Sequence, residues 1–204
     1  MKRVVVTGIG AVTPVGNSAS AFWESVCIGK NGIAPITRFD TSESKYKLAA
    51  EVKDFDPTQY MEKLAAKKLD LFTQYAMAAA SEAMNDSSLE GKIEQDELAV
   101  YFGSGIGGFE TFCESYDMLK EKGARRVSPR FIPKMINNIA AGNIAIRYQA
   151  KNACVAVSTA CATGTTAVGE AFRAIRHGYA VAAICGGSEA CHCQRSDSCF
   201  AAAA

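Results

Sequence analysis

The segment between residues 153 and 185 constrains the fold more than any other part of the sequence. An apolar run at Ala153–Val157 precedes a helical pattern over Ala162–His177, which ends at Gly178 before a second apolar run at Ala180–Cys185. A glycine directly after a helical pattern is typical of a helix end, and two strands joined by a helix form a βαβ unit. The chain is therefore predicted to be an α/β layer structure with a mixed, largely parallel sheet.

The rest of the chain continues this alternation. Strands are predicted at Arg3–Thr7, Leu48–Val52 and Leu98–Phe102, and helices at Ala19–Cys27, Met61–Met84, Phe109–Lys122 and Lys134–Tyr148. The assignments follow from β-branched runs, apolar residues at helical spacing, and glycine or asparagine where a pattern stops. The helix over residues 162–177 is small and apolar on nearly every side as far as Glu170, which is the pattern of a central helix buried on both faces.

Composition excludes several classes of protein. The 22 Lys and Arg residues nearly balance the 21 Asp and Glu residues, whereas a dedicated nucleic-acid-binding domain is strongly basic. No uninterrupted apolar stretch approaches the roughly 20 residues that cross a bilayer, so no membrane association is expected. The apolar run at Val4–Val6 is too short for a secretory signal, so reduced thiols of a cytoplasmic protein are expected. Five of the eight cysteines are scattered through predicted helices and strands, and the other three lie in the last fourteen residues.

Cys161 stands where the predicted strand at 153–157 turns into the helix. The first turn of a helix leaves N–H groups unpaired, and the positive end of the helix dipole stabilises a thiolate there. The following residues, from Ala162 to Gly164, are small enough to let a substrate approach the sulfur, and they also suit close packing of another helix. Spacing alone leaves two interpretations open: a nucleophile, or a small buried apolar residue.

Two further patterns indicate cofactors that we do not predict. Residues 103–108 match the glycine spacing of a dinucleotide-binding loop, but no strand ending in Asp or Glu follows about 20 residues later. Cys191, His192, Cys193 and Cys199 offer four zinc ligands, but adjacent residues seldom face one ion and no C-x-x-C spacing is present. Neither a cofactor nor a metal is predicted, and residues 191–204 are interpreted as an aberrant tail outside the fold.

The stretch Ser158–Gly164 resembles the active-site elbow of the β-ketoacyl synthases, the condensing enzymes of fatty-acid and polyketide assembly. The resemblance continues in the family's order through Arg3–Gly10, Thr13–Gly16, Phe39–Thr41, Gly103–Gly108, Ser128–Pro133 and Gly186–Ala190. It is greatest to the elongating synthases often called synthase II. The initiating and chain-length-modifying relatives are disfavoured because a cysteine occupies the elbow and Ile106 resembles an elongation-type gate. The resemblance implies that residues 1–190 form the amino-terminal half of a thiolase-like fold, so we expect half of the cover of the helix over residues 162–177 to be missing from this chain.

The same resemblance implies an activity and a site. The family catalyses decarboxylative Claisen condensation of malonyl-acyl-carrier protein with a cysteine-bound acyl chain in fatty-acid elongation, and Cys161 matches the nucleophile. Gly105, Ile106 and Gly107 match a loop beside the acyl pocket, with Ile106 helping to gate chain length. No cofactor is implied for this chemistry.

The resemblance also implies partners. Lys67, Lys68, Arg125 and Arg126 match basic positions that dock the acidic acyl-carrier protein; the alternative is that they are solvated surface charges. A homodimer is implied for the full-length family.

The family draws two histidines and a lysine for decarboxylation from a second half. Here the histidines are His177 and His192, and His177 lies about sixteen residues, roughly 24 Å, along the helix from Cys161. We expect this truncated chain to accept an acyl group without completing the condensation. The alternative is a non-catalytic fragment or dimerisation module, in which residues 134–148 and 153–157 supply the subunit contact.

Overall fold

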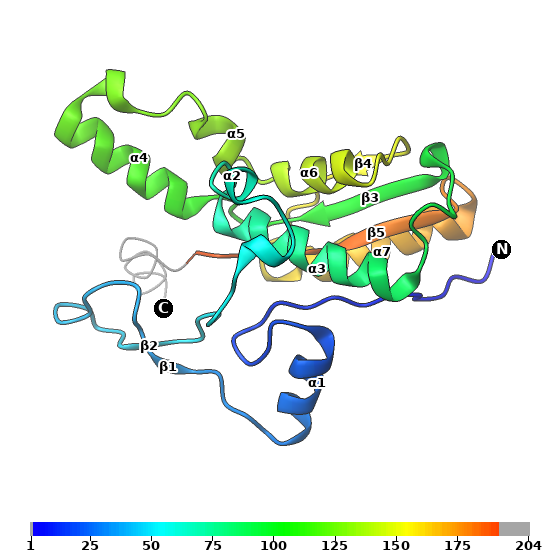
Figure 1. The fold of residues 1–204 in the computed structure, drawn as a ribbon, viewed down its shortest axis with the longest axis horizontal. Helices are drawn as coiled ribbons and strands as arrows, with labels where there is room; N and C mark the ends of the chain where they lie inside the picture. The colour runs from blue at the N-terminus through cyan, green and yellow to red at the C-terminus, as the bar shows by residue number, and fades with distance from the viewer. Residues whose placement is uncertain (1, 192–204) are drawn as a thin grey trace.

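The computed structural model describes residues 2–191, and a three-stranded parallel sheet lies at its centre (Figure 1). The strands are β4 (Cys154–Val155), β3 (Leu98–Gly103) and β5 (Ala182–Gly187), in the spatial order β4-β3-β5. Helix α7 (Thr163–His177) connects β4 to β5, so the predicted βαβ unit is confirmed, with β3 between its two strands.

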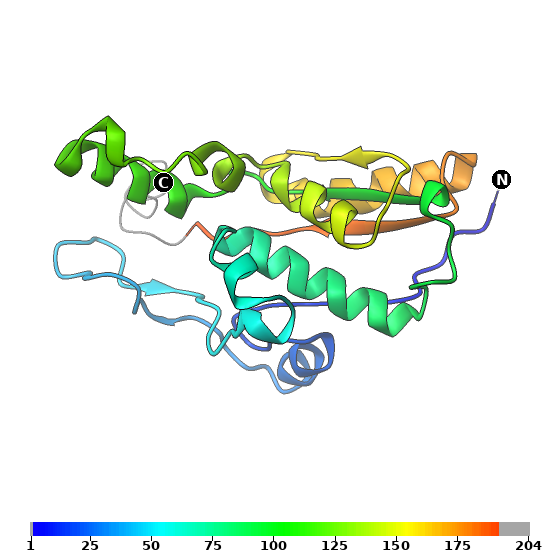
Figure 2. The same ribbon diagram turned by 45° about the horizontal axis from the view of Figure 1, so that its top comes forward.

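Successive side chains of β3 point to opposite faces of the sheet, and helices cover both faces. Leu98, Val100 and Phe102 belong to a hydrophobic cluster with α3 (Leu71–Ser87) and α6 (Ile139–Arg147). Helix α7 packs against β3 and β5 from the other face, and Figure 2 shows the sheet between these helices. The α/β layer structure predicted from the sequence is therefore confirmed.

Among the described residues, α7 is covered on one face only, as expected for a helix that lacks half of its cover. Ala167 and Ala171 are buried against the sheet. Val168 is 48% exposed and Phe172 is 41% exposed. Among residues 2–191, the sheet covers one face of α7 and leaves an apolar face outside.

Local signals placed two helices correctly. Helix α1 (Ala19–Cys27) has the predicted bounds, and the hydroxyl of Ser18 caps it by accepting a hydrogen bond from the Ala21 N–H over 3.1 Å. Helix α4 (Phe109–Lys122) also has the predicted bounds and ends at Gly123, whose φ of 79° favours glycine. Both helices end where their own residues dictate.

The strand predicted at Arg3–Thr7 is absent. The segment is extended but pairs with none of the described strands. The backbone just after it is bound to α3 instead: the Ile9 N–H donates to the Asp86 carboxylate over 2.9 Å, and the Ala11 N–H donates to Glu82 over 2.9 Å. These contacts hold the amino-terminal segment against a helix, away from a sheet ladder.

Two predicted helices are each divided in the structure. Residues 61–84 give α2 (Lys63–Ala66) and α3, because the Asp70 side chain caps a new helix start. Residues 134–148 give α5 (Phe131–Met135) and α6, because the Met135 carbonyl accepts from the Gly108 N–H over 2.8 Å. At each break, a residue forms a hydrogen bond that is not part of a continuous helix: the Asp70 side chain caps a helix start, and the Met135 carbonyl accepts from a distant N–H.

The remaining elements are short. An antiparallel pair joins β1 (Ala34–Pro35) to β2 (Leu48–Ala49), the latter within the predicted strand. Single 3-10 turns lie at η1 (Pro57–Gln59), η2 (Gln95–Glu97), η3 (Ala124–Arg126) and η4 (Ala160–Ala162). Within residues 2–191, every helix is too short or too polar to cross a membrane. The predictions about His192, Cys193 and Cys199 lie outside the described residues.

Candidate active site

Cys161 lies in η4, the turn that carries the chain from β4 into α7. Its thiol is free and the residue is exposed, so it is not part of the core. The preceding residue, Ala160, has a φ of 48°, a left-handed conformation that disfavours a side chain by roughly 1–2 kcal/mol. A tight turn of this kind between a strand and a helix presents the residue at its tip to solvent.

Two threonine hydroxyl groups hold this turn. Thr163 is buried, and its hydroxyl accepts from the Thr159 N–H over 2.9 Å and donates to the Ala160 carbonyl over 2.8 Å. Thr166 shares a hydrogen bond with the Thr159 hydroxyl over 2.8 Å and donates to the Ala162 carbonyl over 2.9 Å. The backbone on both sides of Cys161 is therefore fixed by side chains of α7.

The loop after β3 lies against the same turn. A Cβ atom on Gly105 would be 3.7 Å from the Cα of Ala160, and the Ser158 hydroxyl donates to the Gly105 carbonyl over 3.3 Å. The structure therefore brings the predicted pocket loop beside the residues that precede Cys161. Ile106 is 43% exposed, and Gly107 has a φ of 84°.

Glu189 holds this loop, and the sequence prediction gave it no role. One carboxylate oxygen accepts from the Gly105 N–H over 2.8 Å and from the Ile106 N–H over 3.2 Å. The other accepts from the Ser104 hydroxyl over 3.0 Å, and Ser104 in turn accepts from the Gly107 N–H over 2.8 Å. Glu189 follows β5 and Ser104 follows β3, and these parallel strands are neighbours that end together. A polar residue just after each of two such strands is the sequence signal that could have identified Glu189.

The four predicted docking residues do not form one cluster. Lys67 and Lys68 lie just before α3, whose first turn is bonded to the start of α4 through Asp70. Arg125 and Arg126 lie in η3, after the other end of α4. The 14 residues of α4 span about 21 Å, so the two basic pairs lie at opposite ends of that helix. All four residues are exposed.

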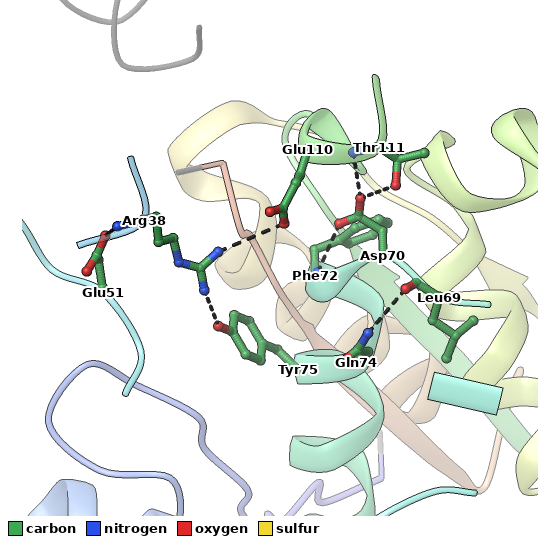
Figure 3. Close-up of polar contacts among 9 residues, drawn as sticks. All are labelled: Arg38, Glu51, Leu69, Asp70, Phe72, Gln74, Tyr75, Glu110 and Thr111. Carbon is green, nitrogen blue, oxygen red and sulfur yellow. Dashed lines mark hydrogen bonds and ion pairs between the residues drawn. The ribbon is translucent and has the colours of Figure 1, made fainter. Parts of the chain in front are cut away.

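A buried carboxylate links the first turns of α3 and α4 (Figure 3). Asp70 is 3% exposed and accepts from the Phe72 N–H over 3.3 Å, which caps α3. Its second oxygen accepts from the Thr111 N–H over 3.1 Å and from the Thr111 hydroxyl over 2.5 Å. This cluster orients α4 relative to the core.

Arg38 joins the segment around β1 and β2 to this region (Figure 3). Its guanidinium donates to the Tyr75 hydroxyl over 3.3 Å and lies 3.9 Å from a Glu110 carboxylate oxygen. Burial raises the pKa of Glu110 above its ordinary value, although Arg38 opposes this shift. Burial alone would raise the pKa of Glu51, but hydrogen bonds from Thr37 and Arg38 outweigh it and hold that pKa below its ordinary value.

A cavity of about 770 Å³ lies between the amino-terminal segment, α3, α7 and β5. Apolar side chains such as Val4, Met84 and Phe172 line it, and Glu189 lies at its wall. Neither Cys161 nor Ile106 lines this space. We therefore take the turn at Cys161 and the loop at 104–107, rather than this cavity, as the candidate site.

The three strands end at one edge, and this edge carries a cysteine at the start of a helix beside a glycine loop. This fold is that of the thiolase-like ketosynthases. The model of the β-ketoacyl synthase amino-terminal domain matches residues 1–204, so the chain belongs to the β-ketoacyl synthase family.

Curated relatives and solved structures agree with this assignment. The chain is 46% identical to 3-oxoacyl-acyl-carrier-protein synthase 2 of Synechocystis sp. over 190 residues, which are 93% of this chain and 46% of that protein. The synthase 2 of Staphylococcus aureus strain COL gives the same identity and coverage. The chain thus spans about half the length of the curated relatives that it matches.

Solved ketosynthases have the same fold. The ishigamide ketosynthase/chain length factor superimposes with a TM-score of 0.87 at 27% identity, covering 96% of this chain and 49% of that one. A type II polyketide synthase complex, described as an acyl-carrier protein with its ketosynthase bound to the hexaketide, gives 0.83 at 25% identity. It covers 98% of this chain and 54% of that one.

Proposed function

We propose that this chain carries out the acyl-transfer step of a 3-oxoacyl-acyl-carrier-protein synthase of fatty-acid elongation, with Cys161 as the residue that accepts the acyl chain. The observation that supports this most directly is the exposed, free thiol at the tight turn between β4 and α7. The names of the relatives at 46% identity support the same reaction class.

In the proposed transfer, the Cys161 thiolate attacks the carbonyl carbon of an acyl-carrier-protein thioester. A bond forms between that carbon and the Cys161 sulfur, and the bond to the carrier's sulfur breaks. The carrier leaves as a thiolate that takes up a proton. The turn held by Thr163 keeps that sulfur exposed at the start of α7.

The condensation that follows needs groups that assist decarboxylation of the malonyl unit. The one histidine within residues 2–191 is His177, at the opposite end of α7 from Cys161. A general acid or base must lie within about 3 Å of the proton it moves, directly or through one water. We infer that residues 2–191 support acyl transfer to Cys161 and do not by themselves support condensation.

Gly105, Ile106 and Gly107 are proposed to line the acyl pocket, with Ile106 limiting chain length. The contact between Gly105 and Ala160 supports this role, because it places the loop next to the acylated residue. No cofactor is proposed for this chemistry.

The proposed partner is acyl-carrier protein. The pair Lys67 and Lys68 and the pair Arg125 and Arg126 would contact separate acidic regions of the carrier, because α4 holds the pairs apart. One solved neighbour is described as a ketosynthase in complex with its acyl-carrier protein, which supports such docking. We further propose a cytoplasmic location, residues 1–190 as a β-ketoacyl synthase amino-terminal domain, and a homodimer for the full-length members of the family.

The test is to incubate the protein with acyl-carrier protein carrying a radiolabelled acyl group and to locate the label by peptide mapping. Label on Cys161 without a 3-oxoacyl product supports the proposal as stated. A 3-oxoacyl product would overturn the inference that residues 2–191 do not support condensation. Absence of label would overturn the acyl-transfer proposal and favour a non-catalytic module.

A further inference from the structure

The backbone donors of the loop after β3 converge on one side chain. The N–H groups of Gly105 and Ile106 donate to the Glu189 carboxylate. The N–H group of Gly107 donates to Ser104, whose hydroxyl donates to the same carboxylate. Three successive donors are thus satisfied, directly or through one hydroxyl, by a residue 84 positions away from Gly105.

Other contacts hold the two ends of the loop: Ser104 is buried, and the Gly108 N–H donates to the Met135 carbonyl over 2.8 Å. The ladder between β3 and β5 ends at Gly103, and glycine populates many backbone conformations. The side chain of Ile106 is 43% exposed, so packing does not fix it. On its other side the loop contacts the turn before Cys161 through the bond from Ser158 to Gly105. The loop therefore lies between Glu189 and the Cys161 turn.

We propose that Glu189 is a positioning residue: it holds the loop over residues 104–107 against the Cys161 turn and thereby sets which acyl chain lengths Cys161 accepts. The acyl-chain part of this inference rests on the proposed function. Glu189 does not touch the sulfur; it acts through the backbone that orients Ile106.

The loop presents its donors to this one side chain. A carboxylate accepts from them through two oxygens. A glutamine at this position could still accept from Gly105 and Ile106 through its oxygen and donate to the Ser104 hydroxyl through its NH2 group, so Glu189→Gln would not test these contacts. The substitution Glu189→Ala removes the partner of all three donors. Glu189 is itself exposed, so no buried space is created.

The first measurement is amide hydrogen exchange of the peptide that contains residues 104–107. Loss of a hydrogen bond worth about 1 kcal/mol predicts roughly fivefold to tenfold faster exchange in Glu189→Ala. Ser104→Ala, which removes one link to the carboxylate, should accelerate exchange at Gly107. Glu170→Ala is the matched control, since Glu170 pairs with Arg173 on the surface of α7. Unchanged exchange in both loop variants would overturn the proposal.

The second measurement is the rate of Cys161 acylation from carrier proteins loaded with short and long acyl chains. In Glu189→Ala, the ratio of acylation rates between the best and worst chain lengths should fall by about fivefold or more, while the rate of Cys161 alkylation by iodoacetamide stays within about twofold. An equal decrease for every chain length would overturn the selectivity role. If the unmodified protein takes up no acyl group, the proposed function and the selectivity role both fail, whereas hydrogen exchange still decides whether Glu189 holds the loop.

Discussion

The hydroxyl of Thr111 donates to the carboxylate of Asp70 over 2.5 Å, and this buried bond joins the starts of two helices that are distant in sequence. Helix α4 carries basic residues at its far end and contacts the core at its near end. This carboxylate therefore helps to set the orientation of that helix.

Substitution of Asp70 by alanine should destabilise the protein by about 3 kcal/mol. The change removes the cap of α3 and leaves the donors of Thr111 without their acceptor. Urea denaturation measures the loss. Asp96→Ala, at an exposed residue, is the control and should change stability by no more than about 0.5 kcal/mol. Equal stability of the two variants would show that Asp70 does not join the helices energetically.

Replacement of Cys161 by alanine should abolish acyl labelling and change the free energy of unfolding by no more than about 0.5 kcal/mol, because the side chain is exposed. The comparison is Cys27→Ala, which removes another exposed free thiol and should keep full labelling. Labelling that survives in Cys161→Ala would assign the acceptor to a different cysteine.

The substitution Thr163→Val keeps the shape of a buried side chain and removes the hydroxyl that holds the turn. Two backbone groups lose a partner, so stability should fall by about 1–3 kcal/mol. Acyl transfer should slow by about tenfold or more because the sulfur is no longer held in place. Thr165→Val, at an exposed position, should leave both the urea midpoint and the acylation rate unchanged.

Glu51 and Glu110 should give pH effects of opposite sign. The pKa of Glu51 is lowered in the folded protein, so its contribution to stability is present above 4.5 and is lost as the pH falls through the folded value. Glu51→Gln should therefore be less stable than the unmodified protein at pH 7, and the difference should shrink in acid.

The pKa of Glu110 is raised, so the folded state binds the proton more tightly and loses stability as the pH rises above 4.5. Relative to the unmodified protein, Glu110→Gln should gain stability over that rise. Urea midpoints between pH 3.5 and 7.5 measure both trends. If the urea midpoints of the two variants, relative to the unmodified protein, changed with pH in the same direction, the opposite pKa shifts of Glu51 and Glu110 would be contradicted.

Local residue patterns were sufficient for much of the fold. The Ser18 cap, the Gly123 end and the apolar run at Leu98 each act on their own neighbours in the chain, and the structure has α1, α4 and β3 where these signals predict them. The prediction failed at Arg3–Thr7, where a run with strong strand preference is held beside α3 by Asp86 and Glu82. Strand preference depends on a pairing partner, which a local run does not specify.

The candidate site divides in the same way. The place of Cys161 at a strand-to-helix turn follows from the order of the elements, because a turn must join an apolar strand to a helical pattern. That Glu189 binds the loop at Gly105 follows from the register of β3 with β5, which places Gly103 opposite Gly187. Register is a property of strands that are distant in sequence and meet only on folding, so the residues that position the loop emerged from packing rather than from any local pattern.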